Sequence, residues 1–126
     1  MVTATRIIVT VTVAGLHHWG NPKPGVEHLG NAHRHQFLVR GEMVVAHDDR
    51  DLEFQLVAEQ LRRAFVACAL SPIPSGAGFV DFGSQSCEML AKATYQHLQD
   101  HLAGSACCAI EIWEDREHGA RVDFTP

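Results

Sequence analysis

The residues best able to do chemistry in this sequence are His33 and His35, two histidines separated by a single residue. They lead into the run Phe37-Leu38-Val39, whose aromatic and β-branched residues favour a β-strand. Side chains two positions apart in a strand point to the same face, so both imidazoles would leave the strand together. Three neutral imidazoles with an open fourth position form a catalytic zinc site, so this pair needs one more histidine.

The third histidine is predicted at the end of the preceding segment. Valine and threonine alternate over residues 6–16, which is the pattern of a half-buried strand, and the valine face continues to His17. His18 falls on the other face and is the alternative ligand. The turn-rich loop at 20–25 joins two strands that would pair antiparallel, which brings the end of the first strand to the start of the second. The competing interpretation is that all these histidines are solvated strand-end residues.

The remaining periodicities predict an α+β fold in a single domain, residues 1–126, with the order β-β-α-α-β-β. The predicted elements after the first strand are a strand from about His33 to Ala46, a helix from about Leu52 to Ala69 capped by Asp51, a helix capped by Ser84 or Ser86 that runs to about Leu102, and strands at Ala106–Trp113 and Ala120–Phe124. In the third strand, the alternation places Cys108, Ile110 and Ile112 on the apolar face.

Glu114 continues that same apolar face. A carboxylate on such a face is costly unless it is paired or bound to something. One interpretation makes Glu114 an anchor that accepts two N–H donors from a heterocycle, and the other makes it a strand-end glutamate that faces water. Cys87 falls in the first turn of a helix, where the helix dipole can lower a thiol pKa, but a structural role is favoured for it and for the other cysteines.

Composition excludes some classes of function. The chain of 126 residues carries a net charge of −5 with a pI near 5.9, and it has no basic run of useful length, which argues against nucleic-acid binding. The four cysteines form no C-x-x-C pair, which favours a reducing compartment. The sequence begins without a signal pattern and has no segment long enough to cross a bilayer, so we expect a cytoplasmic protein without a membrane or nucleic-acid partner.

The sequence resembles the 6-pyruvoyl-tetrahydropterin synthase and 6-carboxytetrahydropterin synthase proteins, the latter from the queuosine pathway. The similar pieces occur in family order along nearly the whole chain. They are Val13-Ala14-Gly15-Leu16-His17, His33-Arg34-His35-Gln36-Phe37, Leu52-Glu53-Phe54, Ser86-Cys87-Glu88-Met89-Leu90-Ala91 and Ile110-Glu111-Ile112-Trp113-Glu114.

The resemblance implies a T-fold, an antiparallel four-stranded sheet with two helices on one face. It implies that His17, His33 and His35 bind Zn²⁺, and that Glu114 anchors a pterin- or purine-like ring. Family members assemble as trimers that stack into hexamers, with active sites at subunit interfaces, so a homo-oligomer is expected. In them zinc polarises the substrate side chain and eases proton abstraction beside a carbonyl.

The chain departs from the family at the groups that move protons. The family's general-base cysteine lies four or six residues before the first histidine of the pair, where this chain has Leu29 and Glu27. Some relatives use a glutamate near this place, so Glu27 is the replacement candidate, with His28 behind it. The family's Asp-His relay is reduced to Asp81. Two functions therefore stay open: a zinc-dependent lyase acting on dihydroneopterin or its triphosphate with atypical acid/base residues, or a non-catalytic protein that binds a purine- or pterin-like ligand.

Overall fold

The computed structural model describes residues 2–70 and 79–125, which form five strands, two α-helices and two short 3-10 turns. The strands are β1 (Thr5–His17), β2 (His33–Val45), β3 (Val80–Asp81), β4 (Cys107–Glu114) and β5 (His118–Asp123). The helices are α1 (Phe54–Val66) and α2 (Cys87–Leu98), and the 3-10 turns are η1 (Glu27–Gly30) and η2 (Leu102–Ala106). None of these helices is long and apolar enough to span a bilayer.

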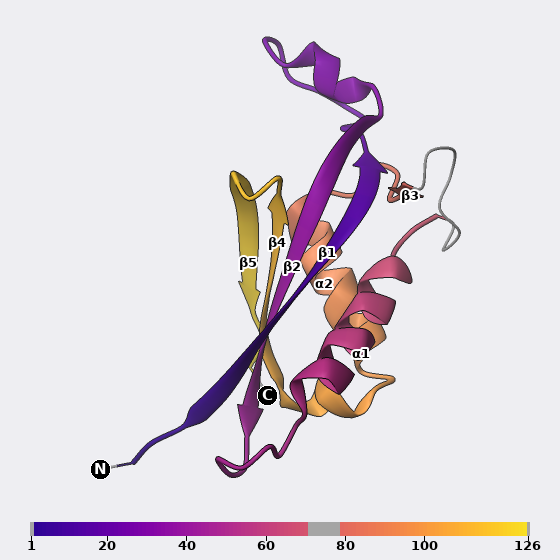
Figure 1. Ribbon diagram of the computed structural model, residues 1–126. Helices are drawn as coiled ribbons and strands as arrows, with labels where there is room; N and C mark the ends of the chain where they lie inside the picture. The colour runs from indigo at the N-terminus through magenta and orange to yellow at the C-terminus, as the bar shows by residue number, and fades with distance from the viewer. Residues whose placement is uncertain (1, 71–78, 126) are drawn as a thin grey trace.

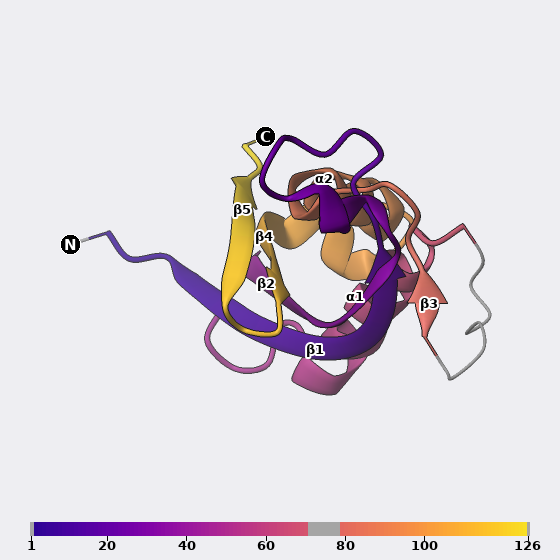
Figure 2. The same ribbon diagram turned by 90° about the horizontal axis from the view of Figure 1, so that it is seen from above.

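The strands form one curved sheet in the order β3-β1-β2-β4-β5, and both helices cover the same face of it (Figures 1 and 2). The predicted α+β class and the placement of the helices are confirmed. The prediction of a four-stranded, purely antiparallel sheet is wrong for the described residues, because β3 adds a fifth strand that runs parallel to β1. This strand has two residues, paired with Gly15 and Leu16, and is too short to produce an alternating pattern in the sequence.

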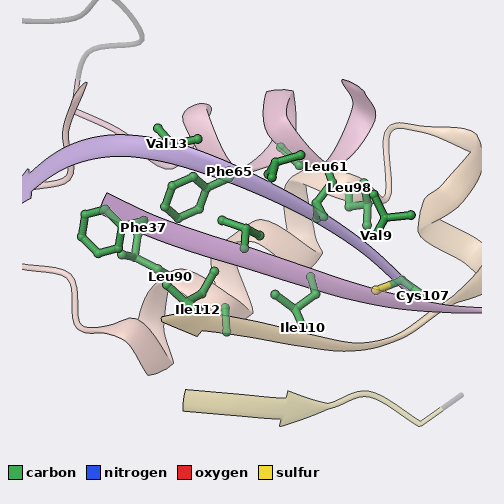
Figure 3. Close-up of a cluster of buried hydrophobic side chains, with 14 of the residues drawn as sticks. Val9, Val13, Phe37, Leu61, Phe65, Leu90, Leu98, Cys107, Ile110 and Ile112 are labelled. Carbon is green, nitrogen blue, oxygen red and sulfur yellow. The ribbon is translucent and has the colours of Figure 1, made fainter. Parts of the chain in front are cut away.

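The hydrophobic core lies between the helices and the sheet (Figure 3). Phe37, Phe65 and Phe82 are fully buried and pack against one another. A Cβ on residue 15 would lie 2.8 Å from the Phe37 ring and 2.7 Å from the Phe82 ring, so only glycine fits there. Since Gly15 pairs with His35 across the sheet, this aromatic layer supports the histidine end of the molecule.

The helix starts settle two predictions about capping residues. The side chain of Ser86, rather than that of Ser84, caps α2 by accepting a hydrogen bond from the Met89 N–H. Asp51 does not cap α1, because its carboxylate accepts the Ala46 N–H instead. Glu53 takes that place and accepts the Leu56 N–H, so the helix begins later than the apolar spacing suggests.

A β-bulge overturns the predicted face of Cys108. Glu42 pairs with Ala109 and Met43 pairs with Cys107, so Cys108 is an extra residue in β4. The bulge shifts the alternation by one position. Cys107 therefore joins the core, while Cys108 is half-buried and its thiol lies 3.3 Å from the carbonyl oxygen of Glu42. Beyond the bulge the predicted parity holds, and Ile110 and Ile112 are fully buried.

Candidate metal centre

Three histidines meet at the end of the sheet where β1 ends and β2 begins. His17 pairs directly with His33 in the antiparallel register, and His35 follows two positions later on the same face. Their ring centroids lie 4.7 to 5.1 Å apart, and one nitrogen from each ring lies within 4.8 Å of the other two. His18 is half-buried and lies outside this group, with its backbone N–H bound to the Gly83 carbonyl.

The outward-facing nitrogen of each histidine is already hydrogen-bonded. Each Nδ1 faces an acceptor, so in the neutral rings Nδ1 carries the hydrogen and Nε2 keeps a free lone pair. Such outer contacts fix the tautomer and the orientation of metal-binding imidazoles. The acceptors are the Gln85 carbonyl for His17 at 3.0 Å, the Asn31 carbonyl for His33 at 2.9 Å and the Asp115 carboxylate for His35 at 2.5 Å.

One of these nitrogens shows whether a metal fits the group. His35 Nε2 is buried, and among the described residues it has no hydrogen-bond partner. A buried polar atom without a partner is uncommon and calls for an explanation. A zinc ion bound by three imidazole nitrogens would supply it, so the three histidines fit a metal by their chemistry as well as by their positions.

The acceptor for His17 is held in place by the segment that follows β3. The Phe82 N–H donates to the Leu16 carbonyl at 2.8 Å, which extends the pairing with β1. The Gln85 side chain then donates to the carbonyls of Cys68 and Phe82 and fixes its own backbone. Asp81, the remnant of the expected relay, accepts the Gly83 N–H and stabilises this turn.

The acceptor for His35 comes from the turn between β4 and β5. Asp115 and Arg116 both have left-handed backbones, with φ of 53° and 60°, in the three-residue turn between the two strands. One Asp115 oxygen accepts the Gln36 N–H at 2.8 Å and the other contacts His35. Sequence reasoning missed Asp115, because no periodic pattern marks a side chain in a turn that reaches back to another strand.

Glu114 lies beside the cluster on the helix-covered face. Its Oε1 is 3.1 Å from His17 Nε2, and its Oε2 is 3.6 Å from His35 Nε2. The hydrogen bond with His17 holds the pKa of Glu114 below its ordinary value. Burial opposes charge on His17, yet the contacts with Glu114 and with the Gln85 carbonyl outweigh it and raise the His17 pKa. Both shifts have the same cause, the contact between the Glu114 carboxylate and the His17 imidazole.

The Cys87 thiol lies 3.5 Å from Glu114 Oε1. Burial, followed by the charge of Glu114, raises the pKa of Cys87 to about 12. The thiol therefore stays protonated and can donate a hydrogen bond to the carboxylate. Burial and the Glu114 charge outweigh any lowering of the Cys87 pKa by the start of the helix.

A cavity of about 580 Å³ opens over these residues. Trp19 and Leu29 supply its apolar wall. The other residues that line it are the three clustered histidines with His18, Ser84, Gln85, Ser86, Cys87, Glu88, Glu114, His118 and Gly119. Glu27 and His28, the predicted acid/base pair, are exposed in η1 outside this lining, and Glu27 accepts the Gly25 N–H.

The fold places the chain in a known structural class. Its structure is similar to that of 6-pyruvoyl tetrahydropterin synthase from Caenorhabditis elegans, with a TM-score of 0.63 and 11% identity over 98% of this chain and 97% of that one. An uncharacterised protein from Wolinella succinogenes gives a TM-score of 0.67 and 10% identity over 97% and 99% of the two chains. No protein-family model and no curated protein matches the sequence. The predicted T-fold, the fold of 6-pyruvoyl tetrahydropterin synthase, is therefore confirmed at the level of architecture.

Proposed function

We propose that the protein is a zinc-dependent lyase that acts on a dihydroneopterin-like compound. The observation that carries this proposal is the convergence of one nitrogen from each of three imidazoles, whose Nδ1 atoms face acceptors, among the residues that line a cavity. Zinc at this position would polarise a hydroxyl or carbonyl of the substrate side chain. The residues that line the cavity would orient that side chain, and Glu114 would bind the heterocycle.

Glu114 is the proposed anchor for the heterocycle. It lines the cavity beside the histidines, 3.1 Å from His17 and 3.6 Å from His35, and its two oxygens can accept two parallel N–H donors from a guanidine-like ring edge. A cavity of about 580 Å³ is within the range of small-molecule sites. Among the described residues none that lines the cavity is Lys or Arg, which favours the unphosphorylated compound over its triphosphate in the single chain.

The proton-transfer role stays with Glu27, with His28 as the second candidate. Leu29 in the same 3-10 turn lines the cavity, and its carbonyl accepts the Trp19 N–H, so η1 borders the site. The Glu27 carboxylate nevertheless faces away into its own loop. In this proposal the Glu27 carboxylate acts only after a movement of η1 brings it into this cavity, or after assembly places it at the cavity of a neighbouring copy of the chain.

Assembly into a homo-oligomer is part of the proposal. β3 and β5 are the edge strands, and β3 pairs only with Gly15 and Leu16 of β1, so within the described residues most of β1 also has an unpaired edge. Unpaired edges favour strand addition between copies unless something blocks them. Light scattering after size-exclusion chromatography would give the mass, and a trimer or hexamer is expected.

Turnover of dihydroneopterin and of its triphosphate, followed by product analysis, tests the activity directly. We expect the native protein to release a shortened or rearranged pterin and the Glu27→Gln protein to lose most of the rate. A native protein that binds dihydroneopterin but never converts it would favour the second function, a non-catalytic protein that binds a purine- or pterin-like ligand. The apolar cavity wall formed by Trp19 and Leu29 is compatible with that alternative.

A further inference from the structure

Trp19 is an exposed aromatic residue at the edge of the cavity over the histidines. Its exposed fraction is 39%, and among the large exposed hydrophobic residues of the described chain it is the only one that lines this cavity. It belongs neither to the hydrophobic core nor to the partly buried residues that pack against the core. Single exposed apolar side chains are ordinary on a protein surface, but one that lines a concave site is a candidate for ligand contact.

The backbone holds Trp19 at this position through the residues next to it. Pairing with the segment after β3 continues past the end of β1, because the His18 N–H donates to the Gly83 carbonyl at 2.9 Å. Alternation then places Trp19 on the same side as His17, two positions earlier. The Trp19 N–H itself donates to the Leu29 carbonyl at 2.7 Å, which closes the loop between the two residues. A contact surface that is fixed in advance loses little freedom when a ligand binds.

Trp113, the other tryptophan of the chain, shows how an indole is accommodated when it serves the fold. It is half-buried on the open face of the sheet, and its Nε1–H donates to the Glu111 carboxylate at 2.8 Å. A Cβ on residue 119 would lie 2.5 Å from the Trp113 ring, so Gly119 makes room for it. Trp113 is therefore bonded and packed within the chain, whereas Trp19 stays exposed beside a cavity.

We propose that Trp19 stacks on one face of the bound heterocycle and restricts the site to flat aromatic rings. This rests on the proposed function, in which Glu114 binds the N–H edge of the ring. A ring that is bound by its edge leaves both faces free, and an indole offers a large, flat, apolar surface to one of them. Leu29, whose carbonyl holds the Trp19 backbone, lines the same wall and adds apolar contact. Glu114 then fixes the orientation of the ring, while Trp19 selects its shape.

Calorimetric titration of the zinc-loaded protein with neopterin tests the stacking without any turnover. We expect Trp19→Leu to lower the affinity about tenfold, because it keeps an apolar side chain but removes the flat ring, and Trp19→Phe to stay within about threefold of the native affinity. Trp113→Phe is the matched control on the opposite face and should bind as the native protein does. Native affinity in Trp19→Leu, or equal losses in Trp19→Leu and Trp19→Phe, would overturn the proposal. All three variants should keep the native zinc content, and loss of zinc from Trp19→Leu would overturn it in favour of a structural role.

Fluorescence quenching locates the contact, because the chain has only two tryptophans. In Trp113→Phe all tryptophan emission comes from Trp19, and we expect saturable quenching by guanosine, a flat ring with a similar N–H edge that does not absorb this emission. In Trp19→Phe the emission comes from Trp113 and should stay constant with guanosine. The reverse pattern, or Trp19 emission unchanged by guanosine and neopterin alike, would overturn the proposal. Absence of dihydroneopterin turnover with these results intact would refute only the lyase function, whereas neopterin binding that Trp19→Leu leaves unchanged would refute only the stacking.

Discussion

Two groups of carboxylates lie on opposite faces of the same sheet and differ in how their charge is balanced. On the open face, Glu42 and Glu111 share contacts of 2.6 to 2.8 Å with the guanidinium groups of Arg40 and Arg121. Arg6 adds a longer contact of 3.4 Å with Glu42. Under the helices, the partners of the Glu114 carboxylate among the described residues are two imidazoles and a thiol. Two anions therefore meet three permanent cations on one face, while Glu114 on the other face has no Lys or Arg partner among the described residues.

This difference separates a structural cluster from a functional one. Arginine stays charged at all ordinary pH values, so the Glu42 cluster is complete within the chain itself. The Glu114 carboxylate has imidazole and thiol partners and no guanidinium among the described residues. Glu114 is half-buried. Partial burial of a carboxylate without a permanent counter-charge is costly, and a site that tolerates this cost is a candidate for binding a ligand.

The largest effect should follow from removing the histidines. We expect the native protein, purified without chelator, to carry about one zinc per chain and the His33→Ala/His35→Ala protein to carry almost none, since one remaining imidazole cannot hold the ion. Elemental analysis by mass spectrometry would measure the content. His97→Ala/His101→Ala removes two histidines at the far end of α2 and should keep the metal. Equal zinc in both variants would contradict the assignment.

The second effect is the dependence of stability on pH through Glu42. Hydrogen bonds from Arg121 and Arg40 lower the pKa of Glu42 from 4.5 to about 2. Between these values the unfolded chain binds the proton and the folded one does not, so stability falls as the pH drops through this window. Urea unfolding measures the free energy of unfolding at about pH 5 and about pH 3. Between these two values it should fall by about 2 kcal/mol less in Glu42→Gln than in the native protein.

The exposed carboxylate of Glu117 provides the comparison for that measurement. Glu117→Gln removes an acidic side chain from the β4–β5 turn. It should keep the native loss between the two pH values, whereas an equal reduction in both variants would show that Glu42 is not responsible.

A smaller effect should come from removing one cation of the complete cluster. Arg40→Met leaves two carboxylates with one close guanidinium, and we expect a loss of about 1–2 kcal/mol in the free energy of unfolding. Arg63→Met breaks an exposed pair with Glu59 on α1 and should cost only about 0.3–0.5 kcal/mol. Urea denaturation compares the two, and equal losses would mean that burial of Glu42 does not strengthen its pairs.

The sequence predicted the three histidines of the metal centre, but not the groups that accept hydrogen bonds from their Nδ1 atoms. His17, His33 and His35 follow from strand parity, because alternation in two paired strands fixes which side chains share a face. The outer contacts come from a loop carbonyl, a turn carboxylate and a two-residue strand. None of these has a period that a sequence could show. The face of Cys108 was predicted wrongly for a related reason, because a single bulge residue leaves no mark in the alternation.

Asp115 offers the smallest and most local way to alter the centre. Asp115→Asn keeps a residue that tolerates the left-handed backbone, but it exchanges the charged acceptor of His35 for a neutral one. Loss of such an outer contact typically lowers metal affinity about tenfold or more, so we expect the zinc dissociation constant to rise by about tenfold with little change in stability. Chelator competition and urea unfolding measure the two quantities separately.

Arg116→Gly, in the same turn, should change the stability of the protein and leave its zinc affinity unchanged. Glycine relieves a left-handed strain of about 1–2 kcal/mol and adds about 0.5–1 kcal/mol of unfolded-chain entropy, for a net gain near 0.5 kcal/mol. Zinc affinity should stay native, because no described contact joins Arg116 to the histidines. If both variants changed the zinc affinity equally, the backbone conformation of the turn, and not the Asp115 carboxylate, would position His35.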